Sequence, residues 1–423
     1  MHRSSARALA GLALFAASLM SSHASAAPPA ASAEKVRVTR IDAEPVEGAF
    51  VGIDAKEVRL EGVAGPIPVA VVREIRFGVD AAPRPLPEGS VGLRVVLRGG
   101  DVVRGALESA TADELTIRPP DLASMKLPFD VIRCVESEAP DRRPCDEPAR
   151  QFPARKGTDV AYAKSGDAFA GTVAEATLKG VVLESGAQKR SLAWADLVVL
   201  HLDGKEPAAR EGAVTEIETA GGSLLLATDA VGDPRGFTLT LAAGPKVVVP
   251  RDALVVVRRS GGAFTRLETL PFTATLSTQN EGDVQRYLES YWGARVDRTQ
   301  GGCPLRIAGT TYRHGIAVYA KSTITVALGG RWTSFSATFG IDDEVLAWHT
   351  DDGAHGDVTA RVLVDGKEAW SSKGSVKGGE PPRKVGPIDL TGATTLVLEV
   401  DAGENLGRLD RADWADPILV EAR

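Results

Sequence analysis

The last third of the chain combines aromatic rings with short polar side chains on segments that we expect to be loops or strand ends. An aromatic ring can stack on the apolar side of a sugar, and carboxylates and imidazoles can hydrogen-bond its hydroxyl groups. This combination is typical of carbohydrate binding. The candidate residues are Trp292, Asp297, Tyr319, Trp348 and His349. For Trp292 and Tyr319, packing inside the fold is the alternative role.

Acidic side chains form a second group of candidates. Asp342 and Asp343 are adjacent, and Asp351 and Asp357 follow in a polar segment. Calcium takes roughly six to eight oxygen ligands, often from loop carboxylates. These four aspartates could therefore hold a structural calcium ion, with a solvated acidic loop as the alternative. The sequence indicates no other cofactor.

Common catalytic motifs are absent from the sequence, which has no HExxH, no GxSxG and no phosphate-binding glycine loop. A glycosidase needs two carboxylates about 5 to 9 Å apart. In a chain with 56 acidic residues, many folds would place some pair at that distance. We therefore predict that the protein is not an enzyme.

Strands must position the candidate residues. Hydrophobic residues alternate with polar or small ones at Ile324, Val326 and Leu328, and again in two later segments. This period of two predicts antiparallel strands with one buried face. Asp365-Gly366, between two such segments, is typical of a two-residue hairpin turn because both positions need positive φ.

Four motifs in this region occur in a characteristic order: YRHGIAVYAKS from Tyr312, then FGIDDE, LVDGKEAW and ADWAD. Together they resemble the NPCBM family of carbohydrate-binding modules, over about Leu270 to Arg423. The resemblance implies a galactose-binding-like β-sandwich of jelly-roll type that binds a glycan, with Trp414 packed in its core. Tyr319 stands where the family pattern has a histidine.

The middle of the chain repeats. Gly48, Gly105 and Gly171 are each followed, 27 residues later, by a hydrophobic residue of a closing strand. A fourth unit has Leu226 in place of the glycine. Four or so short strands per unit, bent at a glycine that avoids a Cβ clash, predict small SH3-like or Sm-like barrels. The fold class is therefore all-β, with tandem small barrels followed by the sandwich.

The start of the chain has the pattern of an export signal. Arg3 and Arg7 precede the apolar segment Ala8 to Met20, and Ala24-Ser25-Ala26 is a typical cleavage site. We expect a signal peptide at 1–26, a disordered linker at 27–34, barrel repeats at 35–80, 91–137, 157–202 and 212–260, and the sandwich at 270–423. The protein is then periplasmic or extracellular, without a membrane span.

Charge and cysteine content limit the partners. The formal net charge of −7 gives nucleic acid no reason to bind. Cys134 and Cys145 flank a polar loop, and an oxidising compartment favours a disulfide between them. Cys303 is then left over, either as a buried thiol or for pairing with another chain.

These observations predict an exported, non-catalytic carbohydrate-binding protein. Its C-terminal sandwich would bind a cell-surface or extracellular polysaccharide, and its barrels would serve as a stalk or adaptor. The alternative is a structural or protein-interaction role at the cell envelope, in which the sandwich has lost sugar binding. Tyr319, at the position of the family's histidine, motivates that alternative.

Overall fold

The computed structural model describes residues 35–41, 43–78, 82–138, 148–207, 212–241, 246–277, 283–347, 355–404 and 408–422. The predicted signal peptide and the linker after it lie outside these residues. The described chain is nearly all β, as expected, with two short α-helices, α1 (Pro148–Gln151) and α2 (Asp283–Trp292). None of the helices in this part of the chain is long and apolar enough to cross a membrane.

Four units of five strands each make up the first part of the fold. The first has β1 (Lys35–Arg40), β2 (Val46–Ile53), β3 (Glu57–Glu61), β4 (Ile67–Pro68) and β5 (Val72–Arg76). The second has β6 (Gly92–Leu97), β7 (Val102–Ala110), β8 (Glu114–Arg118), β9 (Met125–Pro128) and β10 (Ile132–Ser137). The third has β11 (Asp159–Ala163), β12 (Ala168–Thr177), β13 (Gly180–Ser185), β14 (Gln188–Ala193) and β15 (Leu197–His201). The fourth has β16 (Val214–Thr219), β17 (Leu224–Asp233), β18 (Gly236–Leu241), β19 (Lys246–Pro250) and β20 (Leu254–Ser260).

All four units share one pairing scheme. The first strand pairs with the second and the fifth, and the third strand pairs with the second and the fourth. A single 3-10 turn introduces each closing strand: η1 (Val69–Val71), η2 (Phe129–Val131), η3 (Trp194–Asp196) and η4 (Arg251–Ala253). Their likeness to SH3-like barrels stays a prediction.

The repeated glycines lie where the second strand bends from its first partner to its third. A Cβ on Gly48, Gly105 or Gly171 would lie 2.5 to 2.6 Å from a backbone oxygen of the third strand. In each case that oxygen belongs to the residue thirteen positions later, namely Glu61, Arg118 or Glu184. The structure thus agrees with the steric reason for glycine that the spacing suggested.

The units also pair with one another, which the sequence did not predict. β5 of the first unit hydrogen-bonds β20 of the fourth, and β10 of the second hydrogen-bonds β15 of the third. The tandem units are therefore not independent of one another, because hydrogen bonds between strands join them into one sheet. Each closing strand has a free edge, and pairing two such edges satisfies backbone groups that would otherwise face solvent.

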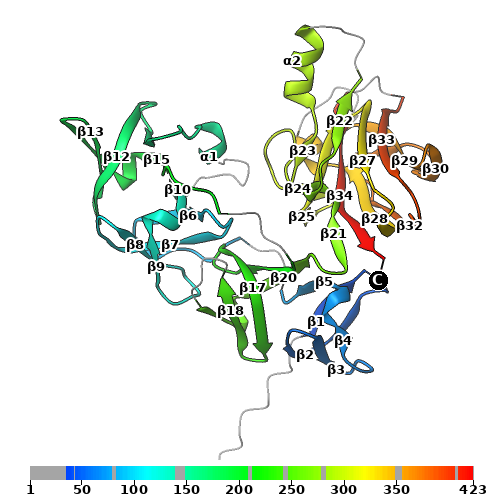
Figure 1. The fold of residues 1–423 in the computed structure, drawn as a ribbon, viewed down its shortest axis with the longest axis horizontal. Helices are drawn as coiled ribbons and strands as arrows, with labels where there is room; N and C mark the ends of the chain where they lie inside the picture. The colour runs from blue at the N-terminus through cyan, green and yellow to red at the C-terminus, as the bar shows by residue number, and fades with distance from the viewer. Residues whose placement is uncertain are drawn as a thin grey trace, which may run out of the picture. The chain divides into compact units, whose positions relative to one another are not determined.

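The C-terminal domain is a sandwich of two antiparallel sheets (Figure 1). The first sheet contains β21 (Phe264–Arg266), β23 (Arg295–Val296), β26 (Gly315–Tyr319), β28 (Trp332–Ile341), β32 (Arg383–Asp389) and β34 (Arg411–Glu421). The second contains β22 (Thr273–Leu276), β27 (Ser322–Ala327), β29 (Asp357–Val364), β30 (Lys367–Ser371), β31 (Val376–Lys377) and β33 (Thr395–Ala402). β24 (Leu305–Ile307) pairs with β25 (Thr310–Tyr312), and the 3-10 helices η5 (Leu267–Thr269) and η6 (Asp343–Ala347) complete the domain.

The core between the two sheets follows the predicted alternation. Ile324, Val326 and Leu328 are buried on one face, and the ring of Trp414 is fully buried as expected. Asp365 and Gly366 have φ values of 47° and 77° and connect β29 to β30, which confirms the predicted hairpin.

Two local expectations are wrong. Tyr291 and Trp292 end the helix α2, which lies near β22 at one end of the sandwich (Figure 1), and do not lie in a loop. Cys134 is a buried thiol and not half of a disulfide, because its side chain packs against Val160 and Val199 where the second and third units meet. Cys303 is the residue that forms a disulfide, and Cys145 lies outside the described residues.

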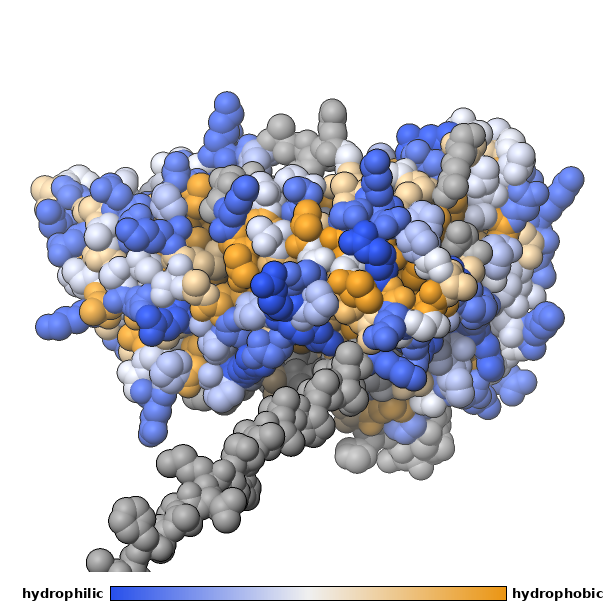
Figure 2. Space-filling model, turned by 90° about the horizontal axis from the view of Figure 1, so that it is seen from below, coloured by the Kyte–Doolittle hydropathy of each residue, from blue (hydrophilic) through white to orange (hydrophobic). Residues whose placement is uncertain are grey.

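Hydrophobic groups on the surface differ between the repeats and the sandwich. Figure 2 shows one face of the molecule, where hydrophobic side chains form separate patches among hydrophilic ones. The exposed hydrophobic residues of the repeats are aliphatic, as at Val248 and Leu178. Tyr287 and Tyr291 of α2, by contrast, are 67% and 57% exposed. Scattered aliphatic exposure is ordinary in soluble proteins, so the exposed rings are the more informative feature.

Candidate functional site

Two of the predicted sugar-binding residues meet on the surface of the sandwich. Trp292, at the end of α2, lies with its ring centroid 4.7 Å from that of Tyr319, at the end of β26. Tyr291 packs edge-on against Trp292 at 4.6 Å. We call Tyr291, Trp292 and Tyr319 the aromatic surface. Trp292 is partly exposed, so a face of this surface remains available to a ligand.

Polar groups border the aromatic surface. The guanidinium of Arg411 lies 5.0 Å from the ring centroid of Trp292, and its Nη1 donates to Oε1 of Glu344 at 2.8 Å. Burial raises the pKa of the Tyr319 hydroxyl, and the nearby Asp410 raises it further, so this group stays a neutral phenol at physiological pH. Rings beside fixed charged and neutral donors are the combination that recognises a sugar.

Asp297 lies elsewhere. It follows β23, whose Val296 pairs with Ile316, so Asp297 is next to the start of β26 while Tyr319 ends that strand. At about 3.3 Å per residue, the two ends of β26 are separated by roughly 13 Å. Asp297 therefore does not join the aromatic surface. Trp348 and His349 lie outside the described residues.

The predicted calcium ligands are used largely by the protein itself. Asp342 accepts backbone N–H groups of Arg306 and Glu344 at 2.8 and 2.7 Å, and Asp343 accepts those of Ala308 and Gly309. These contacts fix β24, β25 and η6 against each other. Calcium binding stays an untested prediction.

Asp357 and Asp351, the other two predicted calcium ligands, do not join that pair. Asp357 begins β29, where its carboxylate accepts from Ser375 and from the backbone N–H of Glu404. Asp351 lies outside the described residues. The described chain therefore shows two of the four aspartates together and a third engaged elsewhere.

Asp413, on β34, forms a buried carboxyl pair with Asp342. It is completely buried, and burial together with the charge of Asp342 raises the pKa of Asp413 well above its ordinary value. Burial also raises the pKa of Asp342, so both carboxyls of the pair favour the protonated form. Nothing in the sequence near Asp413 marks it as part of this pair, because its partner is 71 positions away.

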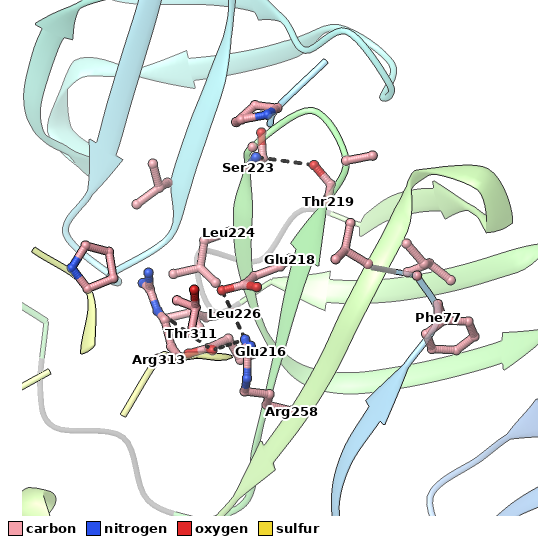
Figure 3. Close-up of a pocket in the computed structure, with 18 of the residues that line it drawn as sticks. Phe77, Glu216, Glu218, Thr219, Ser223, Leu224, Leu226, Arg258, Thr311 and Arg313 are labelled. Carbon is pink, nitrogen blue, oxygen red and sulfur yellow. Dashed lines mark hydrogen bonds and ion pairs between the residues drawn. The ribbon is translucent and has the colours of Figure 1, made fainter. Parts of the chain in front are cut away.

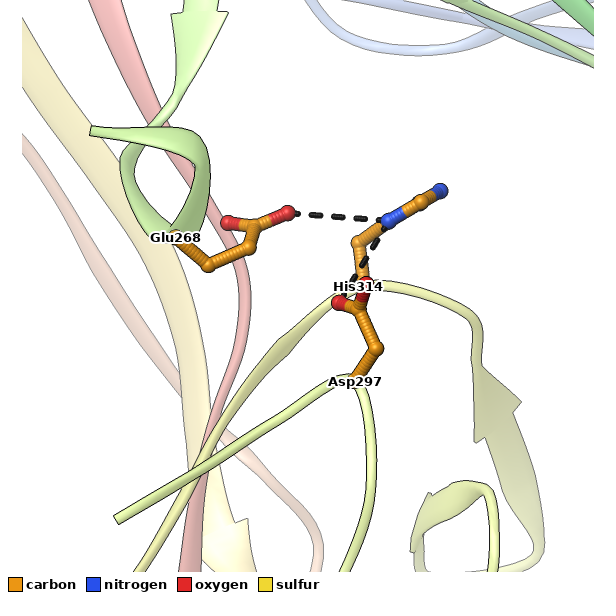
Figure 4. Close-up of side chains that lie close together, drawn as sticks. All are labelled: Glu268, Asp297 and His314. Atoms are coloured by element: carbon orange, nitrogen blue, oxygen red, sulfur yellow. Dashed lines mark ion pairs between the residues drawn. The ribbon is translucent and has the colours of Figure 1, made fainter. Parts of the chain in front are cut away.

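His314 forms a further polar cluster at the start of β26 (Figure 4). Its Nδ1 lies 3.5 Å from Oδ1 of Asp297 and 3.6 Å from Oε1 of Glu268. All three side chains come from short connecting segments that the sheets hold in place. Of these, the sequence analysis named only Asp297, since Glu268 and His314 are 46 residues apart and no spacing connects them.

Comparison with known proteins identifies the domain that holds both clusters. Residues 273–420 match the model of the NPCBM/NEW2 domain. The C-terminal domain is an NPCBM domain. All three residues of the aromatic surface lie within the match. Asp297 and His314 also lie within it, and Glu268 precedes it. The family match confirms the resemblance that the four motifs indicated.

One curated relative is similar to part of the chain. "Putative endo-alpha-N-acetylgalactosaminidase" of Renibacterium salmoninarum is 31% identical over 168 residues, which is 37% of this chain. The chain spans 10% of the length of that relative. The likeness therefore concerns a module and not the whole relative.

Solved structures with similarity to the chain include two carbohydrate-binding modules of Clostridium perfringens. CBM51 from GH95, in complex with methyl-galactose, is 21% identical, covers 37% of this chain and 99% of its own, and has a TM-score of 0.30. CBM51-2 with INT domains from ZmpB, in complex with GlcNAc, is 21% identical, covers 46% of this chain and 37% of its own, and has a TM-score of 0.31. Scores this low carry no argument here.

A cavity of about 880 Å³ borders the NPCBM domain and is lined also by residues of the repeats. Figure 3 shows Glu216, Glu218 and Arg258 of the fourth unit pointing toward one another in it, with Arg313 close by. Arg258 contacts Glu218 at 3.0 Å and Glu216 at 3.4 Å. Arginines outnumber carboxylates in the cavity lining, and Arg258 is paired with the two glutamates.

Proposed function

We propose that this protein binds a carbohydrate through the aromatic surface of its NPCBM domain and performs no catalysis itself. The observation that carries the proposal is the stack of Trp292 on Tyr319, extended by the exposed Tyr291. Several aromatic rings gathered at one place on a surface are typical of a ligand-binding site. The family match at 273–420 supports a glycan as that ligand.

The polar border would set the orientation of the sugar. Arg411 and Glu344 are both only about a tenth exposed and hold each other in a fixed geometry. A rigid charged pair can donate to and accept from neighbouring hydroxyl groups without first losing side-chain freedom. Trp292 would provide the stacking face, with Tyr319 supporting it from below.

The remaining parts of the function are proposals of the same kind. The export signal places the protein in the periplasm or outside the cell, where polysaccharides are available. The four repeats would then hold the NPCBM domain away from an attachment point. The alternative role in binding envelope proteins stays a prediction without support from the comparisons.

The test is binding of the full chain to an array of glycans, including ones that end in galactose, N-acetylgalactosamine and N-acetylglucosamine. Affinities for the glycans that bind are then measured by isothermal titration calorimetry. Trp292→Ala should weaken binding at least about tenfold, which corresponds to about 1.4 kcal/mol for a lost stacking face.

Leu178→Ala is the matched control because Leu178 is a 54% exposed hydrophobic residue of the third unit, far along the chain from the aromatic surface. It should leave the affinity unchanged. The proposal fails if the folded protein binds none of the glycans, or if Trp292→Ala binds as tightly as the unchanged protein.

A further inference from the structure

The separations between the donor atoms of Glu268, Asp297 and His314 are longer than good hydrogen bonds and short enough for the three side chains to share an ion. All three atoms lie within 4.8 Å of one another, and this is the one such group of three among the described residues. The distances from Nδ1 of His314 to the two carboxylates are 3.5 and 3.6 Å. Good N–H···O hydrogen bonds are about 2.7 to 3.2 Å long.

These distances fit a coordination shell. Zinc binds histidine nitrogen at about 2.0 to 2.1 Å and carboxylate oxygen at about 2.0 to 2.2 Å. Two donors of a tetrahedral shell with such bonds are then about 3.4 Å apart. The two separations from Nδ1 of His314, 3.5 and 3.6 Å, are close to that value, and the two carboxylates lie within 4.8 Å of each other.

Glu268 gives an independent reason to expect a cation. Its side chain is only 1% exposed, and neither carboxylate oxygen accepts a hydrogen bond from any residue that the structure describes. Figure 4 shows this carboxylate aimed at His314. A buried carboxylate without hydrogen bonds is costly.

The other nitrogen of His314 has the partner that metal-binding histidines usually have. Nε2 lies 3.4 Å from Glu216, and Glu216 in turn contacts Arg258 at 3.4 Å and Arg313 at 3.9 Å. An N–H at Nε2 directed to a carboxylate leaves the lone pair at Nδ1 for a metal ion. Both arginines pair with Glu216, whereas the charge of Glu268 is opposed by His314 and Arg266.

Asp297 is also held in position. Its Oδ1 accepts the backbone N–H of Gly315 at 3.0 Å, and its own φ of 57° is a conformation that aspartate adopts more readily than most residues. Asp297 and His314 both line the cavity beside the NPCBM domain, so water could reach a bound ion. Neighbouring residues therefore fix the orientation of the three side chains, and the cavity leaves one side of the site open to water.

We propose that Glu268, Asp297 and His314 bind a divalent transition-metal ion, for which zinc is the best fit. One imidazole and two carboxylates are a mixed set that suits such an ion better than calcium, which prefers oxygen ligands alone. The competing explanation is an imidazolium that neutralises the carboxylates without any metal. The site is separate from the aromatic surface, so the proposal does not depend on sugar binding.

The experiment uses the full chain after treatment with a chelator and dialysis. Zinc is titrated by calorimetry and cobalt by absorption, since cobalt in a tetrahedral site gives intense visible bands. We expect one ion per chain and a rise in the melting temperature with zinc. Glu268→Gln and His314→Gln should each abolish the binding, and Glu216→Gln should weaken it by about 10- to 100-fold.

Asp343→Asn is the matched control, because Asp343 belongs to the other acidic cluster and should leave zinc affinity unchanged. Glu268→Gln also guards against misfolding, since its metal-free melting temperature should equal or exceed that of the unchanged protein. The proposal is overturned if the unchanged protein binds no zinc. It is also overturned if calcium alone binds, or if Glu268→Gln and His314→Gln retain zinc binding.

Discussion

The two ends of β26 differ in almost every physical respect although only five residues separate them. At the start, the side chains of Glu268 and His314 are 1% and 11% exposed, and Asp297, 35% exposed, borders the cavity. At the end, Tyr319 supports rings that are partly open to solvent. One strand thus positions a site suited to an ion and a surface suited to an uncharged ligand.

The degree to which side chains are buried determines which kind of ligand each end of β26 can bind. A charge gains strong electrostatic partners only where the local dielectric is low, and there an uncompensated group is expensive. An aromatic ring contributes most binding free energy where it is exposed, because a ligand can then displace water from its face. Because an ion site needs burial and a sugar site needs exposure, we expect the two ends of β26 to bind their ligands independently. The following changes test that independence.

Gly315→Ala should have the largest effect. Gly315 has a φ of 154°, and an added Cβ would lie 2.6 Å from the backbone oxygen of Trp414. The variant should lose more than about 3 kcal/mol of stability because β26 must separate from β34. Urea unfolding measures this. Gly309→Ala, where φ is 81° and no atom lies within 4 Å, should cost only about 1 kcal/mol.

Equal losses in the two glycine variants would show that β26 is not rigidly held. The two ends could then not be treated as fixed sites. A much larger loss for Gly315→Ala would support the fixed arrangement.

Asp413→Asn should change the pH dependence of stability. Asp413 pairs in register with Ala317, in the middle of β26. Since its pKa is raised in the folded state, its stabilising contribution is complete below the unfolded pKa and is lost as pH rises through the folded one. The asparagine keeps a donor for Asp342 and carries no charge. It should be more stable than the unchanged protein at high pH, by about 1 to 3 kcal/mol.

Thermal melts from pH 4 to pH 9, run with a chelator present, would measure this difference. A constant difference between the two proteins across that range would contradict the assignment of Asp413 as the protonated partner.

Measuring both glycan and zinc binding in variants of each end should show whether the two ends bind independently. Trp292→Ala should lose glycan affinity at least about tenfold and keep its zinc affinity within about twofold. Glu268→Gln should show the reverse pattern. Calorimetry with both ligands on both variants gives the four values. If either variant lost both activities, the two ends would be coupled through β26.

Tyr319→Phe should have the smallest effect. If Tyr319 acts as a support for the ring of Trp292, the hydroxyl contributes little and affinity should change by less than about 0.5 kcal/mol. Tyr319→Ala removes the support and should cost about 1 kcal/mol of binding free energy. Glycan titrations of both variants compare them. A large loss in Tyr319→Phe would instead indicate that the hydroxyl contacts the sugar.

Local sequence was sufficient for much of the fold. The alternation around Ile324, the turn at Asp365-Gly366 and the glycines at the bends all report on contacts between residues near in sequence. The helix α2 could also have been found. Its signal in the sequence is the helical spacing of Val284, Tyr287, Leu288 and Tyr291.

The rest depended on contacts between distant segments. Glu268 meets His314, and Asp413 meets Asp342, only because the sheets bring their strands together. No period or motif encodes those meetings. The position of Cys134 also depends on a distant segment, since its side chain packs against Val160 and Val199 of the third unit.

The way in which the closing strands pair restricts how this protein could change its length. The first unit is joined to the fourth and the second to the third, and β7 of the second unit also pairs with β17 of the fourth. Removing any one unit would leave the closing strand of its partner with an unpaired edge, open to aggregation. The four repeats therefore act as one connected block, and forms that lack a single repeat should be prone to aggregation.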